Sequence, residues 1–374
     1  MTRIAYAAAR VFDGQNLLTD HAVLSESGIC AGVVPVSDVP EGYACQRLEG
    51  MVLPGFVDLQ VNGGGGVMFN DATDIAGLRR IAEAHAGTGT LGILPTLITD
   101  TPERTTQAIR AVREALAAGV PGILGLHLEG PHLSRARKGA HEAALIRPMQ
   151  DSDLQELCAA ARDLPNLMVT VAPEAASLAQ IAALAEAGAL VSLGHSDCDY
   201  ETAMAAFGAG ARCATHLFNA MSPLTSRAPG LVGAALDHGA VAAGLIADGI
   251  HVHPVSLRLA LRANRGPGRP FLLTDAMAPL GTDDASFTLN GRRIRRAGGR
   301  LTLEDGTLAG ADLTMTQAIG VTTGPVGVPM AEALAMATSG PTGLLRDAPG
   351  FGRFERGQRL RAIHWPPEGA VASL

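Results

Sequence analysis

From residue 53 onward the chain repeats one pattern: a short apolar run, a cluster of Gly, Pro, His or Asn, and then an amphipathic stretch. Short apolar runs are typical of strands buried on both faces, and amphipathic stretches are typical of surface helices. The runs occupy 53–60, 92–98, 123–129, 167–172, 190–195, 213–217, 241–247 and 271–275. Eight strands that alternate with helices predict an α/β fold of the (β/α)8 TIM barrel type, for which about 250 residues are typical.

The expected helices carry recognisable start and stop signals. Thr101 followed by Pro102 offers an N-cap with proline at the first helical position. Ser177 and Gln180 have the spacing of a capping box, and Gly188 is suited to end the same helix. A doubly wound sheet is disfavoured, because no GxGxxG or GxxxxGK[ST] motif follows the first expected strand.

Two segments outside the repeat have a different pattern. Residues 1–52 and 346–374 show short alternating strands without a helical period, and we expect them to form one small β-sandwich domain. The barrel then spans 53–345. Within it, 287–307 contains Asn290-Gly291, the sequence of a tight hairpin turn, and predicts a β-hairpin insertion after the eighth strand.

Composition narrows the classes of protein that fit. The chain has 374 residues, 47% of them hydrophobic and 17% charged, which excludes a disordered protein and leaves room for a large core. Its longest apolar stretch, near 240–247, is far shorter than the roughly 20 residues that a membrane span needs. The N-terminus lacks the apolar core of a secretory signal, so we expect a cytoplasmic protein.

Charge argues against a nucleic-acid partner, and the cysteines argue against disulfide or thiolate zinc sites. With a net charge of −7 and basic residues scattered along the chain, nucleic acid is not an expected partner. The five cysteines are also scattered and form no CxxC motif. They therefore predict free thiols rather than a disulfide framework or a thiolate zinc cluster.

Polar residues stand at the carboxyl ends of several expected strands. Glu129 ends the third strand, His195 the fifth, His216 the sixth and Asp275 the eighth. Because TIM-barrel active sites lie at this end, we expect these side chains to meet at the barrel mouth. Divalent metals favour imidazole and carboxylate ligands, and three protein ligands leave a position open for water. We therefore predict one divalent ion on Glu129, His195 and His216, with zinc as first choice and iron, manganese or cobalt as alternatives.

An isolated histidine is more often part of the core or the surface than a metal ligand. We give that interpretation to four histidines: His21, His85, His238 and His364. His127 lies two residues before Glu129 and so shares its face of the expected strand. It either supports the ligands or fills the barrel interior.

Eight ordered motifs between residues 53 and 315 give a more specific indication. They are LPGFVDLQVNGGGGVMFND (53–71), HLEGPHL (127–133), KGAH (138–141), LGHSDCDY (193–200), ATHLFNAMSPLTSRAPGLVG (214–233), ADGIHV (247–252), LLTDAMAP (272–279) and LAGADLTM (308–315). Together they resemble the N-acetylglucosamine-6-phosphate deacetylases, a family of the amidohydrolase superfamily. The resemblance implies a (β/α)8 barrel with a small β domain formed by both termini, in agreement with the hydrophobic pattern.

The resemblance also implies roles for residues at the barrel mouth. It gives Glu129, His195 and His216 as metal ligands and Asp275 as the catalytic aspartate. Amide hydrolysis needs a nucleophile at neutral pH and an acid to expel the amine, and one carboxylate can take a proton and return it to the leaving nitrogen. His141, in KGAH, matches the residue that polarises the acetyl carbonyl and stabilises the tetrahedral intermediate.

A phosphorylated substrate needs a site of its own, because a protein of net charge −7 does not attract a dianion by its overall field. The resemblance gives this role to Arg227, whose guanidinium can bond two phosphate oxygens. The other substrate contacts that it implies are Ala140, His141, Asn219, Ala220, His251, Leu308, Ala309 and Gly310. Of these, His251 resembles a residue that reaches across a homodimer interface, and 308–310 resembles a loop that closes over the substrate.

The first strand departs from a common amidohydrolase pattern. Many members end it with HxH, which supplies ligands for a second metal, whereas this chain has Gln60 and Asn62. Neutral amides are poorer ligands, so we predict a site with one metal ion. Gln60 and Asn62 then support the ligands or contact water.

The sequence thus predicts a metal-dependent hydrolase that removes acetate from N-acetyl-D-glucosamine 6-phosphate, in amino-sugar catabolism or cell-wall sugar recycling. Three alternatives stay open: deacetylation of the galactosamine epimer, another amidohydrolase reaction on a cyclic amide or nucleobase, and an inactive barrel that binds sugar phosphates. The sequence alone does not separate the two epimers.

Overall fold

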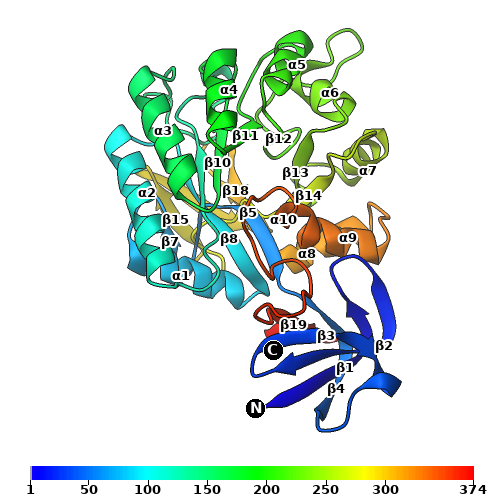
Figure 1. The fold of residues 1–374 in the computed structure, drawn as a ribbon. Helices are drawn as coiled ribbons and strands as arrows, with labels where there is room; N and C mark the ends of the chain where they lie inside the picture. Colours follow the sequence, from blue (N-terminus) through cyan, green and yellow to red (C-terminus); the bar gives the residue numbers. More distant parts are fainter. Residues whose placement is uncertain (1) are drawn as a thin grey trace.

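The computed structural model describes residues 2–374, and its central feature is a sheet of eight parallel strands (Figure 1). In sheet order these are β14 (Pro270–Leu273), β13 (Ala242–Ile246), β12 (Cys213–Ala214), β11 (Leu190–Leu193), β10 (Leu167–Val171), β9 (Leu126–Glu129), β8 (Thr90–Ile98) and β5 (Phe56–Val61). Each apolar run that the sequence singled out overlaps one of these strands.

The sheet closes on itself between its first and last strands. The Asp275 backbone N–H donates to the Gln60 carbonyl at 3.1 Å, and the Asn62 N–H donates to the Ala276 carbonyl at 2.9 Å. Val61 and Ala276 form a parallel bridge between these two hydrogen bonds. The carboxyl ends of β5 and β14 therefore meet, as a closed barrel requires.

Helices connect successive strands and lie on the outside of the barrel (Figure 1). They are α1 (Ile75–Ala86), α2 (Pro102–Ala117), α3 (Asp151–Asp163), α4 (Leu178–Glu186), α5 (Tyr200–Gly208), α6 (Gly230–Asp237), α7 (Pro254–Ala263), α8 (Met315–Thr323), α9 (Met330–Ala337) and α10 (Ser339–Thr342). The predicted helix signals are confirmed: Thr101 caps α2, Ser177 and Gln180 form a capping box on α4, and Gly188 follows α4 with a φ of 97°.

Both termini contribute to a second sheet, which lies below the barrel in Figure 1. Its order is β20 (Ala372–Ser373), β19 (Ala362–Trp365), β4 (Ala44–Pro54), β1 (Arg3–Phe12), β2 (Leu17–Glu26) and β3 (Ile29–Pro35). The first apolar run, 53–60, is divided between β4 and β5 at Gly55. A Cβ at Gly55 would lie 2.4 Å from Cγ of Leu91, so only glycine allows the chain to pass here.

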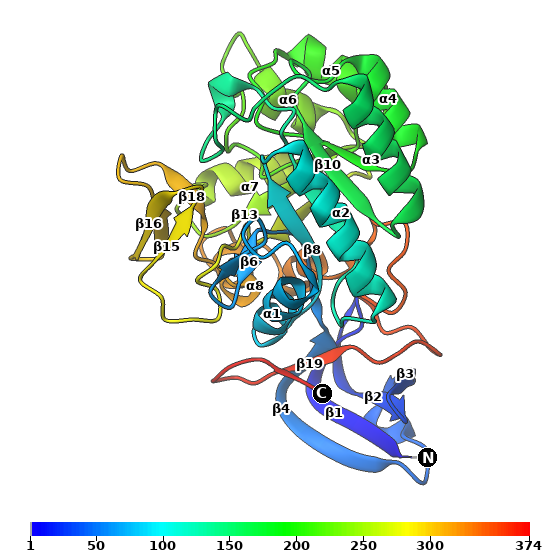
Figure 2. The same cartoon turned by 90° about the vertical axis from the view of Figure 1, so that its left-hand side faces the viewer.

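The segment expected as a hairpin is a four-stranded antiparallel sheet: β15 (Ser286–Leu289), β16 (Arg292–Ala297), β17 (Arg300–Thr302) and β18 (Leu308–Ala311). The predicted turn is present, with positive φ at Asn290 and Gly291. Leu289 and Ile294 belong to an apolar cluster that also contains Ile98 at the end of β8. This sheet therefore packs against the barrel, beside its mouth (Figure 2).

A layer of polar side chains crosses the barrel interior. His127 is fully buried, with Nε2 at 2.8 Å from Oγ1 of Thr170, which lies 2.7 Å from Oγ1 of Thr215. Thr215 in turn lies 2.6 Å from Oγ of Ser192. With Nδ1 of His127 at 3.2 Å from Oγ1 of Thr96, both ring nitrogens have partners within the layer, which favours the interior-filling interpretation.

The expected fold, a TIM barrel with a small β domain built from both termini, is confirmed. A short ribbon of β6 (Gly63–Gly64) and β7 (Val67–Met68) follows the first barrel strand and contains part of the glycine run. Among the described residues, no helix combines the length and the apolarity that crossing a membrane requires.

Candidate active site

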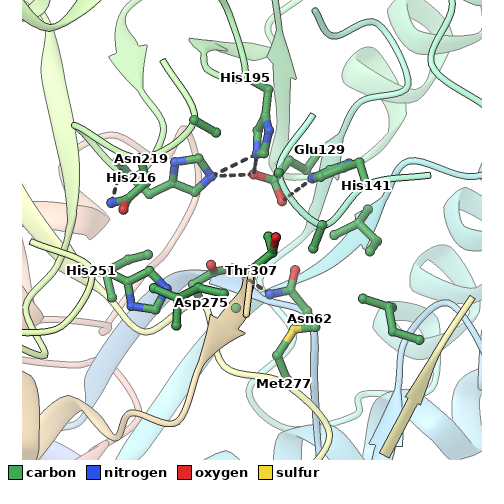
Figure 3. Close-up of a pocket in the computed structure, with 18 residues that line it drawn as sticks. Asn62, Glu129, His141, His195, His216, Asn219, His251, Asp275, Met277 and Thr307 are labelled. Carbon is green, nitrogen blue, oxygen red and sulfur yellow. Dashed lines mark hydrogen bonds and ion pairs between the residues drawn. The ribbon is translucent and has the colours of Figure 1, made fainter. Parts of the chain in front are cut away.

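Two imidazoles and one carboxylate meet at the barrel mouth (Figure 3). Glu129 is the last residue of β9, and His195 and His216 lie two residues beyond β11 and β12. Oε1 of Glu129 is 3.2 Å from Nε2 of His195 and 2.9 Å from Nε2 of His216. The two Nε2 atoms are 3.1 Å apart. The three predicted ligands are thus brought together, all of them buried.

Sharp turns after the strands direct these side chains inward. His195, His216 and Asp275 have φ values of 47°, 29° and 53°, in the left-handed region that residues with a Cβ seldom adopt. Such strained conformations are held in place by the surrounding structure and gather at functional sites. All three follow barrel strands by two residues, so the same local turn recurs around the mouth.

The donor atoms suit a divalent cation. The backbone carbonyl of Arg137 lies 2.8 Å from Nδ1 of His195, which places the proton on Nδ1 and leaves a lone pair on Nε2. Burial would raise the pKa of Glu129, but its close contacts with the His195 and His216 rings hold it well below its usual range. A carboxylate and imidazole lone pairs this close together are the kind of ligand set that zinc and similar ions take.

His141 lies on the edge of this cluster. Its ligand atoms, with those of Glu129 and His195, fall within 4.8 Å of one another, so it could join a metal site. Its Nε2 is 3.7 Å from Oε2 of Glu129. The Nε2 atoms of His195 and His216 lie nearer to the Glu129 carboxylate. We therefore favour His216 over His141 as the third ligand.

Thr99, just beyond the end of β8, fixes the orientation of His141. Its backbone N–H donates to Nδ1 of His141 at 3.4 Å, and its Oγ1 lies 2.7 Å from the same nitrogen. Because a backbone N–H can only donate, Nδ1 is an acceptor and Nε2 carries the proton. Burial lowers the pKa of His141 to about 3, with the nearby His195 adding to the effect, so the ring is neutral at physiological pH.

Asp275 is held by the two amides of the first strand. Nδ2 of Asn62 donates to its Oδ1 at 2.6 Å, and Nε2 of Gln60 donates to the same oxygen at 3.2 Å. Nε2 of Gln60 also contacts Oε1 of Glu129 at 3.0 Å. Burial, followed by the charge of Glu129, raises the pKa of Asp275. A carboxyl in this environment is suited to accept a proton and to return it.

These groups line a cavity of about 240 Å³. Most of the site residues predicted from the sequence line it. They are Asn62, Glu129, Ala140, His141, His195, His216, Asn219, Ala220, His251, Asp275, Leu308 and Gly310. Gln60 and Ala309 are fully buried and do not line it. Arg227 is exposed and does not line it either.

His251 reaches the cavity of its own chain. Its Nδ1 lies 2.6 Å from Oδ2 of Asp248, which also accepts backbone N–H groups from Ile250 and His251 through Oδ1 at 2.8 Å. No second subunit is therefore needed to bring His251 to the cavity.

Sequence reasoning missed six residues of the cavity wall, four of them apolar: Ile98, Gly139, Ile246, Met277, Leu289 and Thr307. Ile98 and Ile246 are the last residues of β8 and β13, so their places at strand ends could have identified them. Leu289 ends β15 and Thr307 directly precedes β18, and no local signal connects them to the barrel mouth.

Comparisons with known proteins identify the family of this chain. The family model described as "Amidohydrolase family" matches residues 51–368. An N-acetylgalactosamine-6-phosphate deacetylase from Shewanella is 40% identical, with 92% of this chain and 88% of the relative covered. An N-acetylglucosamine-6-phosphate deacetylase from Haemophilus influenzae is 36% identical over 96% of this chain and 94% of its own length.

Solved structures of such deacetylases superpose closely. The enzyme from Pasteurella multocida has a TM-score of 0.93 at 34% identity, with 99% of this chain and 97% of that one covered. A mutant of the Mycobacterium smegmatis enzyme in complex with N-acetyl-D-glucosamine-6-phosphate has a TM-score of 0.89 at 32% identity, with 99% and 97% covered. The chain belongs to the amidohydrolase family and is similar to its amino-sugar-6-phosphate deacetylases over nearly its whole length.

Proposed function

We propose that the protein is a metal-dependent hydrolase that converts N-acetyl-D-glucosamine 6-phosphate to D-glucosamine 6-phosphate and acetate, in amino-sugar catabolism or cell-wall sugar recycling. The observation that carries this proposal is the convergence of a histidine–carboxylate cluster, Asp275 and His141 on one cavity. The deacetylases similar to this chain act on substrates of this class, as their names state.

Glu129, His195 and His216 would hold the metal ion. A divalent cation in such a site supplies Lewis acidity, which makes water a nucleophile at neutral pH and polarises a carbonyl oxygen. Zinc is our first choice, because it favours nitrogen and oxygen ligands of this kind. Gln60 and Asn62 direct their amide N–H groups at carboxylates, which agrees with a site for one ion rather than two.

Asp275 and His141 then perform the proton chemistry. Asp275 accepts the proton of the attacking water and returns it to the amine nitrogen as the carbon–nitrogen bond breaks. His141 donates a hydrogen bond from its Nε2–H to the acetyl oxygen, where negative charge develops. Thr99 keeps this proton on the correct nitrogen of His141 by occupying Nδ1.

The phosphate group is assigned to Arg227 with support from Asn219, Ala220 and His251. The last three line the cavity, whereas Arg227 lies in the exposed segment 223–228. Arg227 can reach the phosphate if this segment folds over the cavity, or if the second copy in a homodimer presents it. We retain the homodimer as part of the proposal, and we place the enzyme in the cytoplasm, where phosphorylated sugars are retained.

Deacetylation of N-acetylgalactosamine 6-phosphate is the second candidate. The Shewanella relative, at 40% identity, carries the name of that activity, as does one from Escherichia coli at 31%. The two sugars differ in the configuration of one hydroxyl group. Relative rates on the two epimers decide between the candidates.

Amine release from four sugars tests the proposal: both epimers of the N-acetylated 6-phosphate, and both unphosphorylated parents. We expect the 6-phosphates to react with a kcat/KM at least about 100-fold higher than their parents, because charge-assisted phosphate bonds contribute a few kcal/mol. Arg227→Ala should lose much of this preference. Arg110→Ala, on the exposed face of α2, is the matched control. No amine release from any of the four sugars would leave a binding protein or another amidohydrolase reaction.

A further inference from the structure

Asp58 is a carboxyl group buried beneath the barrel mouth. It lies in β5, two residues before Gln60, and its exposed fraction is 0%. Three N–H and O–H groups donate to it: the Gln60 N–H at 3.1 Å, the Thr274 N–H at 3.1 Å and Oγ1 of Thr274 at 2.5 Å. Burial raises the pKa of Asp58 to about 7, because an ionised carboxylate at this position is destabilised by the loss of its hydration.

These hydrogen bonds cross the seam where the barrel closes. Asp58 stands on β5, and Thr274 directly follows β14. Oγ1 of Thr274 also accepts the N–H of Ala276 at 3.2 Å. The residue between them, Asp275, donates its N–H to the Gln60 carbonyl at 3.1 Å. The segment 274–276 is thus fixed from both sides.

The segment needs this support because its central residue is strained. Asp275 has a φ of 53°, in the left-handed region that residues with a Cβ seldom adopt. If Thr274 were free to rotate, Asp275 could relax to a negative φ. Its carboxyl group would then leave Nδ2 of Asn62, which lies 2.6 Å from it.

We propose that Asp58 and Thr274 form a positioning pair, which holds the backbone turn at Asp275 so that the Asp275 carboxyl faces the reacting atoms. The proposal rests on the proton-transfer role given to Asp275 in the proposed function. Displacement of a catalytic group by about 1 Å can cost a factor of about 100 in rate. The pair therefore affects turnover more than substrate binding.

Two substitutions at Thr274 test the pair. Thr274→Val keeps the shape of the side chain and removes its hydroxyl, whereas Thr274→Ser keeps the hydroxyl and its bond to Asp58. We expect Thr274→Val to lower kcat by about 10- to 100-fold with KM changed less than about threefold, and Thr274→Ser to restore kcat to within about threefold of wild type. Thr170→Val is the matched control, since Thr170 is an equally buried, hydrogen-bonded threonine of the barrel interior.

Three outcomes would contradict the positioning role of Asp58 and Thr274. They are an unchanged kcat in Thr274→Val, equal losses of kcat in the Val and Ser variants, or an equal loss of kcat in Thr170→Val. A crystal structure of Thr274→Val gives a readout that does not depend on activity. There we expect the Asp275 carboxyl to leave Nδ2 of Asn62, and an unmoved carboxyl contradicts the pair. Wild-type protein that releases no acetate contradicts the proposed function instead, and the crystallographic result still decides the positioning claim.

Discussion

Which nitrogen of each site histidine carries the proton depends on the hydrogen-bond partner of its other nitrogen. His195 directs the lone pair of Nε2 at the proposed metal position because the Arg137 carbonyl occupies Nδ1, at 2.8 Å. His141 offers an Nε2 proton because Thr99 occupies its Nδ1. The same residue type therefore supplies a lone pair at one place and a proton at another, 4.3 Å away between ring centres.

Replacing Asp275 tests the proton carrier. Asp275→Asn preserves the shape of the side chain and an oxygen that can accept from Asn62, but the amide cannot take up a proton. We expect kcat to fall by about 10²- to 10⁴-fold, with metal content and substrate affinity retained. Initial rates, elemental analysis and calorimetry measure the three quantities. An Asn variant with wild-type turnover would exclude Asp275 from proton transfer.

Replacing Thr99 tests the protonation of His141. Thr99→Val removes the hydroxyl that lies 2.7 Å from Nδ1, while Thr99→Ser keeps it. We expect the Val variant to lose about 10-fold or more in kcat and the Ser variant to remain close to wild type. Steady-state kinetics of the two variants give the comparison. Similar kinetics in both would show that the hydroxyl does not orient His141.

Among the larger elements, the β15–β18 sheet contributes most to the site beyond the barrel itself. Leu289, Thr307, Leu308 and Gly310 from this sheet line the cavity. The Arg292 guanidinium, on β16, donates to the Ala140 carbonyl at 2.5 Å, next to His141. The insertion is therefore a wall of the active site and is anchored to the loop that carries His141.

Gly310 packs closely against the catalytic segment. It has a φ of 61°, and a Cβ there would lie 2.5 Å from Cγ of Met277 and 2.8 Å from the Asp275 carbonyl oxygen. We expect Gly310→Ala to lower kcat/KM by about 10-fold or more. The control, Gly306→Ala, lies in the turn between β17 and β18, with a φ of 85° and nothing within 4 Å of its Cβ, so only stability should change. Equal kinetics in the two variants would contradict the close packing.

The sequence predicted the strands and helices better than the contacts between distant segments. The eight barrel strands follow from apolar runs, because strands buried on both faces carry a strong and local signal. The convergence of Glu129, His195, His216 and Asp275 on one cavity follows from their places at strand ends. The position of Arg227 away from the cavity, and the wall residues Leu289 and Thr307, depend on how loops fold over the mouth. Contacts of this kind between distant segments leave no periodic trace in a sequence.

For the molecule as a whole, the net charge of −7 and the expected anionic substrate are compatible only if recognition is local. Some ionisable groups of the barrel lie buried away from the mouth. His85 on α1 is such a buried group: it is fully buried, and its Nε2 contacts the Gly63 carbonyl at 3.0 Å, which ties α1 to the glycine-rich ribbon.

His85 therefore makes stability depend on pH. Burial lowers its pKa from 6.5 to about 4, so below pH 6.5 the unfolded chain binds a proton that the folded chain does not. The stabilising contribution is complete above this range and is lost as the pH falls toward 4. Between about pH 7.5 and about pH 5, we expect wild type to lose roughly 2 kcal/mol more unfolding free energy than His85→Gln. Urea denaturation at the two pH values measures this difference, and parallel losses in both proteins would argue against it.

The central claim is that one divalent ion, held by Glu129, His195 and His216, is required for deacetylation. Metal-depleted protein titrated with zinc, with bound metal and acetate release from N-acetyl-D-glucosamine 6-phosphate measured together, tests it most directly. We expect no acetate release without metal, a rise in proportion to bound metal up to about one ion per chain, and no further rise beyond it. Full activity in the metal-free protein, or activity that requires a second ion, would contradict this claim.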